Sequence, residues 1–256
     1  MRPITFLIAV LAAAPYTTAA AQGEKPRPWT FTIGVGSSPF NADAFSQDMH
    51  YNDAFDDYFI NPDQDQKTSV ASVMVGLGRS LLKRGSLVLD ANLNLNVLLN
   101  FPMTGIVLEI ATGPRWSVTQ NLQLFGMLAG GFAGVSGKVG TVPRGNNTGA
   151  DLMLSPIGKE TAPVGSSFNM EGYSLGGSVA GGINLMITPR FGLQGNLTYR
   201  AYGDIDNWTI KVKDVDAEGE TVELFEMEIA DFESDGEPGA IGIGGLAFGL
   251  NLVFSF

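Results

Sequence analysis

Residues 87–99 read LVLDANLNLNVLL, and their alternation decides the fold. Seven apolar side chains occupy the odd positions, while most even positions are polar. A period of two residues is that of a β-strand, whose successive side chains point to opposite faces. Because polar groups facing hydrocarbon are costly, the polar face must look into a protein interior. The segment therefore predicts a strand with its aliphatic face toward lipid and with these residues inside: Asp90, Asn92, Asn94 and Asn96.

A water-soluble barrel with an apolar interior, as in the lipocalins, has the same periodicity and is the alternative interpretation. The opposite face of such a strand would meet water, and water-facing strands normally carry Lys and Glu. Here Asn92, Asn94 and Asn96 alternate with aliphatic residues, and no charge lies among them. Residues 191–200 repeat the pattern, and their polar face carries Gln194, Asn196, Thr198 and Arg200. Both segments favour a barrel with a polar interior and an apolar outer wall.

The same alternation predicts eight strands along the chain. Tight connections separate strands two and three, four and five, and six and seven, whereas three other connections are long. An even number of strands with alternating short and long connections is typical of a transmembrane β-barrel. The fold class predicted is all-β, an eight-stranded antiparallel up-and-down transmembrane barrel with long external loops, over 29–256. Its strands are expected at 29–36, 68–82, 87–100, 105–117, 122–135, 172–187, 191–202 and 239–256.

The first residues have the layout of a secretory signal peptide. Arg2 precedes an apolar run, and small residues follow near Ala21, so we expect 1–21 to be removed and 22–28 to form a short tail. The chain contains no cysteine, so its stability must come from packing and hydrogen bonding. The formal net charge of −11 makes nucleic acid an improbable partner, because phosphate binding needs positive charge.

Parity sets the pairing of the third and fourth strands. If the odd residues of 87–99 and the even residues Ile106 and Leu108 both face lipid, the connecting loop has an even number of residues. A four-residue loop at 101–104 satisfies this condition. In that register Asp90 lies opposite Arg115, and Asn96 lies opposite Glu109. An ionised group in a narrow barrel is costly unless it is paired, so we expect an ion pair of Asp90 with Arg115 and suggest Arg200 as a partner of Glu109.

The sequence resembles the small eight-stranded bacterial outer-membrane barrels, such as the transmembrane domain of OmpA, OmpX and the opacity proteins. The residues that carry the resemblance are the signal peptide, MITPRFGLQGNLTYR at 186–200 and the terminal GLNLVFSF at 249–256. The resemblance covers essentially all of 22–256. It implies an outer membrane with its lipid and lipopolysaccharide around the wall, periplasmic turns and extracellular loops. It also implies that the barrel-assembly machinery recognises the final aromatic residue, Phe256, as an assembly signal.

Acidic residues are concentrated in two of the long loops. Loop 37–67 holds seven acids, and loop 203–238 holds thirteen, of the 26 in the chain. A solvated, aggregation-resistant face is the simple interpretation. Binding of an extracellular ligand or of a divalent cation is the functional one.

One part of the second acidic loop resembles a calcium-binding loop. DVDAEGE at 214–220 has acids at the first, third and fifth positions and Gly219 at the sixth. The twelfth position is Phe225 where a bidentate Glu is needed, so we interpret the segment as a hairpin turn and predict no metal site. The hairpin at 208–229 is expected to extend the sheet beyond the membrane. The alternative is a ten-stranded barrel.

His50 is the single histidine, and it is the one candidate for catalysis. Outer-membrane acyltransferases and deacylases of this architecture use His with Ser and a carboxylate, but no Ser can be assigned to His50 from the sequence. The segment around it places Phe45, Met49, Phe55 and Phe59 at roughly helical spacing, as in a loop folded over the barrel mouth. We therefore predict no enzymatic activity and no cofactor.

Three hypotheses for function remain. Eight strands leave an interior that side chains fill, which excludes a wide diffusion pore. The leading hypothesis is a structural or surface-interaction protein that acts through its acidic external loops. A narrow channel for small solutes is the second, and an outer-leaflet lipid-modifying enzyme that depends on His50 is the third.

Overall fold

The computed structural model describes most of the chain from Trp29 onward. The expected signal peptide, 1–21, and the tail, 22–28, lie outside the described residues. The described ranges are 29–41, 49–53, 56–60, 69–100, 103–228, 231, 233–234 and 240–256.

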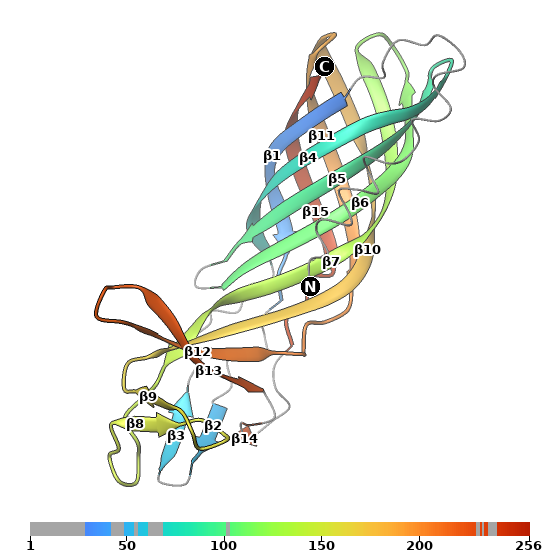
Figure 1. The fold of residues 1–256 in the computed structure, drawn as a ribbon. Coiled ribbons are helices and arrows are strands. Elements are labelled where there is room, and N and C mark those ends of the chain that lie inside the picture. The colour runs from blue at the N-terminus through green and yellow to red at the C-terminus, as the bar shows by residue number, and fades with distance from the viewer. Residues whose placement is uncertain are drawn as a thin grey trace.

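Eight antiparallel strands close into a barrel (Figure 1). Each strand pairs with its neighbour, and the last strand pairs with both β11 and β1, which closes the ring. The expectation of eight strands is confirmed. The strands are β1 (Trp29–Pro39), β4 (Ser69–Arg84), β5 (Leu87–Leu99), β6 (Met103–Ser117), β7 (Leu122–Thr141), β10 (Ser167–Thr188), β11 (Phe191–Tyr202) and β15 (Gly245–Ser255).

The barrel has a turn end and a loop end. The turn end carries three short connections and the C-terminus, and the loop end carries the long connections and the short connection between β5 and β6 (Figure 1). No helix in the described part of the chain is both long enough and apolar enough to cross a bilayer.

The wall has the orientation that the alternation predicts. Asp90 is 7% exposed and Asn96 is 5% exposed on the inside, whereas Leu128 on the outside is 63% exposed. Between Trp116 and Ile106 the outer face of β6 covers about 33 Å of strand, which at a tilt of about 40° spans about 25 Å of membrane. That height matches the hydrocarbon-facing band of a transmembrane barrel.

The register of β5 with β6 corrects the prediction by two residues. Asp90 lies opposite Gly113 and not Arg115, and Asn96 lies opposite Val107 and not Glu109. The last pair is Leu99 with Thr104, so the connection between paired residues is 100–103 and not 101–104. A shift of two residues keeps every side chain on its face, so parity alone could not distinguish the two registers.

The strands β7 and β10 continue past the barrel at the loop end. The hairpin of β12 (Thr209–Val215) and β13 (Thr221–Glu228) pairs with the first residues of β10. It extends the sheet outside the ring, as expected, and it adds no strand to the barrel. Gly219 has a φ of 85° in its turn, and Asp216 Oδ1 accepts hydrogen bonds from the amides of Glu218 and Glu220.

Two small sheets complete the loop end. One contains β2 (Met49–Asn52), β3 (Asp57–Ile60) and β14 (Glu233–Ser234), and the other contains β8 (Leu152–Leu154) and β9 (Thr161–Pro163). The helical spacing noted around His50 is misleading, because β2 and β3 form a hairpin with Met49 opposite Ile60. The aromatic positions Phe45 and Phe55 lie outside the described residues.

Candidate functional site: the barrel lumen and its cap

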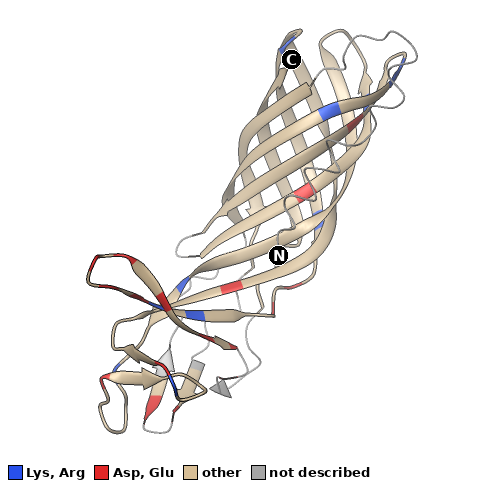
Figure 2. Ribbon diagram, in the orientation of Figure 1, with Lys and Arg blue, Asp and Glu red and all other residues tan. Residues whose placement is uncertain are grey.

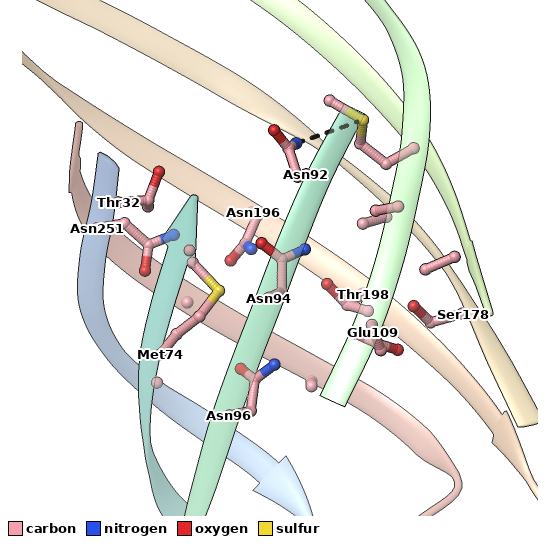
Figure 3. A pocket seen from close by; sticks show the side chains of 18 of the residues that line it. Thr32, Met74, Asn92, Asn94, Asn96, Glu109, Ser178, Asn196, Thr198 and Asn251 are labelled. Carbon is pink, nitrogen blue, oxygen red and sulfur yellow. Dashed lines mark hydrogen bonds between the residues drawn. The ribbon is translucent and has the colours of Figure 1, made fainter. Parts of the chain in front are cut away.

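The middle of the lumen is built from asparagines that lie opposite glycines of the neighbouring strand. Asn92 and Asn94 of β5 pair with Gly78 and Gly76 of β4. A Cβ atom at Gly78 would lie 2.0 Å from Asn92 Oδ1. The absence of a side chain on one strand therefore makes room for the amide of the next. The same relation joins Asn196 to Gly249 and Asn251 to Gly34, and Figure 3 shows several of these amides around one cavity.

An ion pair closes the lumen near the turn end. Arg115 Nε donates to Asp90 Oδ2 at 2.6 Å, and Ser80 Oγ donates to Asp90 Oδ1 at 2.8 Å. Arg115 Nη1 also donates to Gln123 Oε1 at 3.0 Å. The structure thus brings Asp90 and Arg115 together across a diagonal of the sheet, because the long arginine side chain spans the two-residue offset. Ser80 and Gln123, which complete this network, were not predicted from the sequence.

Glu109 and Arg200 lie farther toward the loop end. Tyr202 donates its hydroxyl proton to Glu109 Oε1 at 3.1 Å, and Arg200 Nη1 donates to Ser38 Oγ. No ion pair within 4.0 Å joins Glu109 to Arg200 among the described contacts, so the suggested pairing is not formed. Both side chains line the same cavity as Asn92, Asn94 and Asn96.

The space left in the lumen is small. One polar cavity has a volume of about 80 Å³, and a second, beside Asp90 and Arg115, has about 40 Å³. Since one water needs about 10–15 Å³ on this measure, the larger cavity holds roughly five to eight waters. Both cavities are polar and suited to water.

Between these cavities and the loop end, the interior becomes apolar. Leu98, Met103 and Val107 point inward near the loop end and are completely buried. They belong to a cluster that continues outside the barrel through the extended β7 and β10, with members such as Phe168 and Met170. We call this cluster, which fills the mouth of the barrel, the cap core. Residues from the external segments complete it: Phe40, Tyr51, Tyr58, Ile205, Trp208, Ile210, Val212, Phe225, Met227, Ile241 and Ile243.

Sequence reasoning missed the cap core. A uniformly polar interior was inferred from the middle of β5, where the alternation is regular. The signal was present at the end of the strand, where Val97, Leu98 and Leu99 are apolar in succession. A run that is apolar on both faces indicates burial on both faces, here by lipid on one side and by the cap core on the other.

Two tyrosines link the external hairpin of β2 and β3 to strand β8. The hydroxyl of Tyr51 donates to the carbonyl of Leu154 at 2.9 Å, and that of Tyr58 donates to the carbonyl of Leu152 at 2.6 Å. Burial, together with the negative charge of Asp53, raises the pKa of each tyrosine to about 12. Both hydroxyls therefore remain protonated donors at neutral pH.

Two acids of the first loop bind backbone amides in the same region. Asp56 accepts from the amides of Asn147 and Thr148 at 2.6 and 2.8 Å, and Asp53 Oδ2 accepts from the amide of Leu154 at 2.9 Å. Burial alone would raise the pKa of Asp56, but hydrogen bonds from Thr148, Asn147 and Asp57 outweigh it and hold the pKa well below its usual range. These acids link the loops to each other, which the simple picture of a solvated acidic face did not anticipate.

The candidate for catalysis, His50, and the possibility of a metal site both concern the external part of the molecule. His50 lies in β2 with Nε2 3.5 Å from Asp57 Oδ1. Within the described ranges, no group of three or more His, Cys, Asp or Glu side chains is arranged to hold a metal ion.

The hairpin of β12 and β13 carries a charged outer face. Lys211 Nζ lies 3.2 Å from Glu171 Oε2 and 3.7 Å from carboxylate oxygens of both Glu223 and Glu226. The hydrogen bond with Glu171 is the main cause that raises the pKa of Lys211 above its ordinary value. Figure 2 shows that acidic residues gather on this hairpin and the neighbouring loop-end segments, while most of the barrel wall is uncharged.

No protein-family profile matches the chain, and no curated protein matches it. Solved structures with similar folds include Ail, the attachment invasion locus protein of Yersinia pestis, at 9% identity and a TM-score of 0.41, covering 91% of this chain and 100% of that chain. They also include Neisserial surface protein A, at 7% identity, a TM-score of 0.44 and coverage of 90% and 97%. A major outer membrane protein from Thermus thermophilus has 10% identity, a TM-score of 0.45 and coverage of 89% and 99%. The closed ladder and the apolar outer wall, and not these distant similarities, identify the chain as a membrane β-barrel of the bacterial outer-membrane type.

Proposed function

We propose that this protein is an outer-membrane surface protein in which the barrel is the anchor and the external sheet binds a cationic partner. The proposal includes no solute transport and no enzymatic activity. The observation that carries it is the contrast between the two parts of the molecule. The lumen holds small cavities of about 80 and 40 Å³, and the cap core lies between them and the loop end. The loop end, in contrast, contains an ordered sheet that packs on the cap core.

The strand β13 supplies the surface that supports binding. Among the described residues it is the last strand of its sheet and pairs with β12 alone, although Asp231 Oδ2 accepts from the amide of Glu228 at its end. An added strand could pair with the outer edge ahead of Glu228. Glu223, Glu226 and Glu228 are exposed along this strand, and Phe225 and Met227 anchor it to the cap core. An extended basic segment would match both the open edge and the negative charge.

Binding of a basic peptide tests the proposal. The protein is placed in nanodiscs of phosphatidylcholine and titrated with a fluorescent oligolysine peptide, and anisotropy is measured at low and at physiological salt. We expect salt-sensitive binding that becomes at least about tenfold weaker in the variant Glu223→Gln/Glu226→Gln/Glu228→Gln, because charge pairs at a docking face set affinity and encounter rate.

A matched control removes the same number of charges from exposed turns. The variant Glu160→Gln/Glu218→Gln/Glu220→Gln has the same net charge as the β13 variant but leaves the outer face of β13 intact. We expect its affinity to stay within about twofold of the parent. Equal weakening in both variants would mean diffuse attraction without a site, and an absence of binding at low salt would reject the proposal.

A further inference from the structure

An arginine lies on the outer wall of the barrel close to the turn end. Arg79 of β4 is directly opposite Trp29 of β1, and its guanidinium carbon is 5.3 Å from the centroid of the Trp29 ring. On its other side Arg79 pairs with Ala91, which belongs to the lipid-facing side of β5. A charge on the lipid-facing side of a membrane barrel is costly, so an arginine there indicates a partner for its charge.

Aromatic side chains place Arg79 at the level of the lipid headgroups. Phe191, Phe254 and Phe31 pair in one row across three strands, with ring centroids 5.3 and 6.3 Å apart. Aromatic residues mark the boundary between hydrocarbon and headgroups in membrane barrels. One step closer to the turns, Trp29 and Arg79 belong to the next row. The guanidinium therefore lies on the headgroup side of this boundary, in the leaflet that faces the periplasm.

A β-bulge places a second arginine on the same face of β4. The pairing of β4 with β5 shifts by one residue between Ser80 and Leu82. Beyond the shift Arg84 pairs with Leu87, which is exposed on the outer face. Without the extra residue Lys83 would occupy that face, because successive residues of a strand point to opposite sides. The bulge thus gives the outer face a second guanidinium in place of an ammonium.

The charge at this end of the molecule is positive. Besides the two arginines of β4, Lys83 and Arg190 lie at the turns, and the main-chain carboxylate of Phe256 is opposed to them. Among the described acids, Asp90 is closest to a turn along the chain, and it lies inside the barrel in an ion pair. In the sequence, 22–28 contain two basic residues and one acidic residue. An anionic headgroup is therefore attracted, whereas an ammonium headgroup meets no acidic side chain on the described outer face here.

The contact with Trp29 positions Arg79 for binding a phosphate. A cation–π contact is made with the electrons of the aromatic ring, whereas a guanidinium binds a phosphate through its N–H groups, two at a time. Trp29 is itself held in place by two backbone hydrogen bonds with Phe256, of 2.7 and 2.9 Å. The pair thus presents a positioned phosphate-binding group at headgroup depth.

We propose that Arg79 and Trp29 form a binding site for an anionic phospholipid of the periplasmic leaflet. Arg79 binds the phosphate, and Arg84 and the basic turns favour a headgroup that carries no ammonium. The acyl chains lie along the apolar wall beyond the aromatic row, which favours a lipid over a soluble phosphate. The site is at the opposite end of the molecule from β13, so it does not depend on the proposed function.

Lipid retention measured by native mass spectrometry tests the site. The full chain is purified in detergent with equal amounts of phosphatidylglycerol and phosphatidylethanolamine of the same chain length. We expect the parent protein to retain phosphatidylglycerol at least about fivefold more than phosphatidylethanolamine. In Arg79→Gln this preference should disappear while retention of phosphatidylethanolamine stays as in the parent, because the acyl chains still meet the same wall. A parent protein without the preference would reject the site.

The matched control is Lys83→Gln. It removes the same charge from the same strand, but Lys83 pairs with Val88, on the side of the hairpin opposite to Arg79. Its preference for phosphatidylglycerol should stay within about twofold of the parent, because the positioned guanidinium is intact. An equal loss in both variants would show a diffuse attraction to the basic turns and would overturn the site.

The role of Trp29 has its own pair of variants. Trp29→Leu keeps every charge and the backbone bonds to Phe256, so a fall of about threefold or more in phosphatidylglycerol retention would come from loss of the cation–π contact. Trp116→Leu is the control, because Trp116 is 54% exposed on the outer face near the turns and stacks on no cation among the described contacts. Its retention should equal that of the parent. Equal retention in the two variants would contradict the positioning role of Trp29.

A soluble competitor separates a lipid site from a general phosphate site. Glycerol 3-phosphate in large excess should leave the retained phosphatidylglycerol in place, because it lacks the acyl chains that the wall holds. Displacement of the lipid by this compound would assign the site to soluble phosphates and contradict the proposed occupant.

Discussion

At the scale of single residues, the lumen depends on glycines that face asparagines. Gly34 of β1 lies opposite Asn251 of β15, and a Cβ atom at Gly34 would be 2.0 Å from Asn251 Oδ1 and 2.4 Å from the carbonyl oxygen of Leu250. The backbone contact is the important one, because a neighbouring strand cannot move aside as a side chain can. The sequence shows that position 34 is a glycine, but only the structure shows which atoms lie against it.

We expect Gly34→Ala to lower the free energy of unfolding by about 1–3 kcal/mol, the usual effect of forcing a methyl group into filled space. The control is Gly126→Ala, since Gly126 has no heavy atom within 4 Å of its Cβ position. Urea unfolding of both variants in phospholipid vesicles gives the comparison. A similar loss of stability in both would show that steric room inside the barrel is not the cause.

Asp56 gives the external part an acid-sensitive link. Its pKa is held below the usual range, so its contribution to stability is complete above the unfolded-chain pKa of about 3.9 and is lost as the pH falls from there through the folded pKa. We expect hydrogen exchange at the amides of Asn147 and Thr148, corrected for intrinsic rates, to accelerate on acidification below about pH 4.

The variant Asp56→Asn isolates this link. Its amides at Asn147 and Thr148 should exchange faster than those of the parent at neutral pH, because the charged acceptor is gone. The extra acceleration below about pH 4 should also be absent, since the side chain no longer titrates there. An unchanged acid response in the variant would assign the pH dependence to another group.

At the scale of the elements, alternation predicts which face of a strand meets lipid more securely than it predicts register. The middle of β5 carries Asn92 and Asn94 between aliphatic residues, and its orientation follows from those residues alone. The pairing of β5 with β6 was predicted two residues away from its position, because both registers satisfy the same parity. Both registers keep the same side chains on each face, so the pattern of one strand cannot choose between them.

Phe256 takes part in closing the barrel through its backbone. Trp29 and Phe256 exchange two backbone hydrogen bonds of 2.7 and 2.9 Å, while the Phe256 side chain is 68% exposed. Closure of the barrel thus uses the backbone of Phe256 and leaves its aromatic side chain exposed.

We expect Phe256→Ala to refold into detergent micelles as the parent does, because the backbone pairing is kept. In cells its level in the outer membrane should fall severalfold, if the ring is the assembly signal that the resemblance implies. Immunoblots of outer-membrane fractions measure this level, and Leu246→Ala, which removes an exposed side chain at the other end of β15, is the control. Equal losses in both variants would remove the special role of Phe256.

At the scale of the whole molecule, two seals in series close the barrel. Asp90 and Arg115 close the turn end, and the cap core closes the loop end, with cavities of about 80 and 40 Å³ in the lumen. Removing one seal leaves the other in place. This arrangement supports the proposal that the barrel is an anchor.

We expect planar bilayers containing the protein to show no discrete conductance, and we expect the same of the variant Asp90→Asn/Arg115→Gln. Replacing both partners avoids an unpaired buried charge, whose cost would be about 3 kcal/mol or more. The double variant therefore stays folded and tests whether the lumen conducts once the ion pair is removed. Discrete openings in the parent that change in the variant would restore the channel hypothesis.

The sequence by itself determined the class of the fold, the number of strands in the ring and the side of the wall that faces lipid. These follow from local alternation, because the period of a strand and the cost of polar groups in hydrocarbon act on each segment independently. Only the tertiary structure decided the register and the cap core. Each of these depends on residues far apart in the chain, such as Val107 and Trp208 in the same buried cluster, which come together only after the barrel has closed.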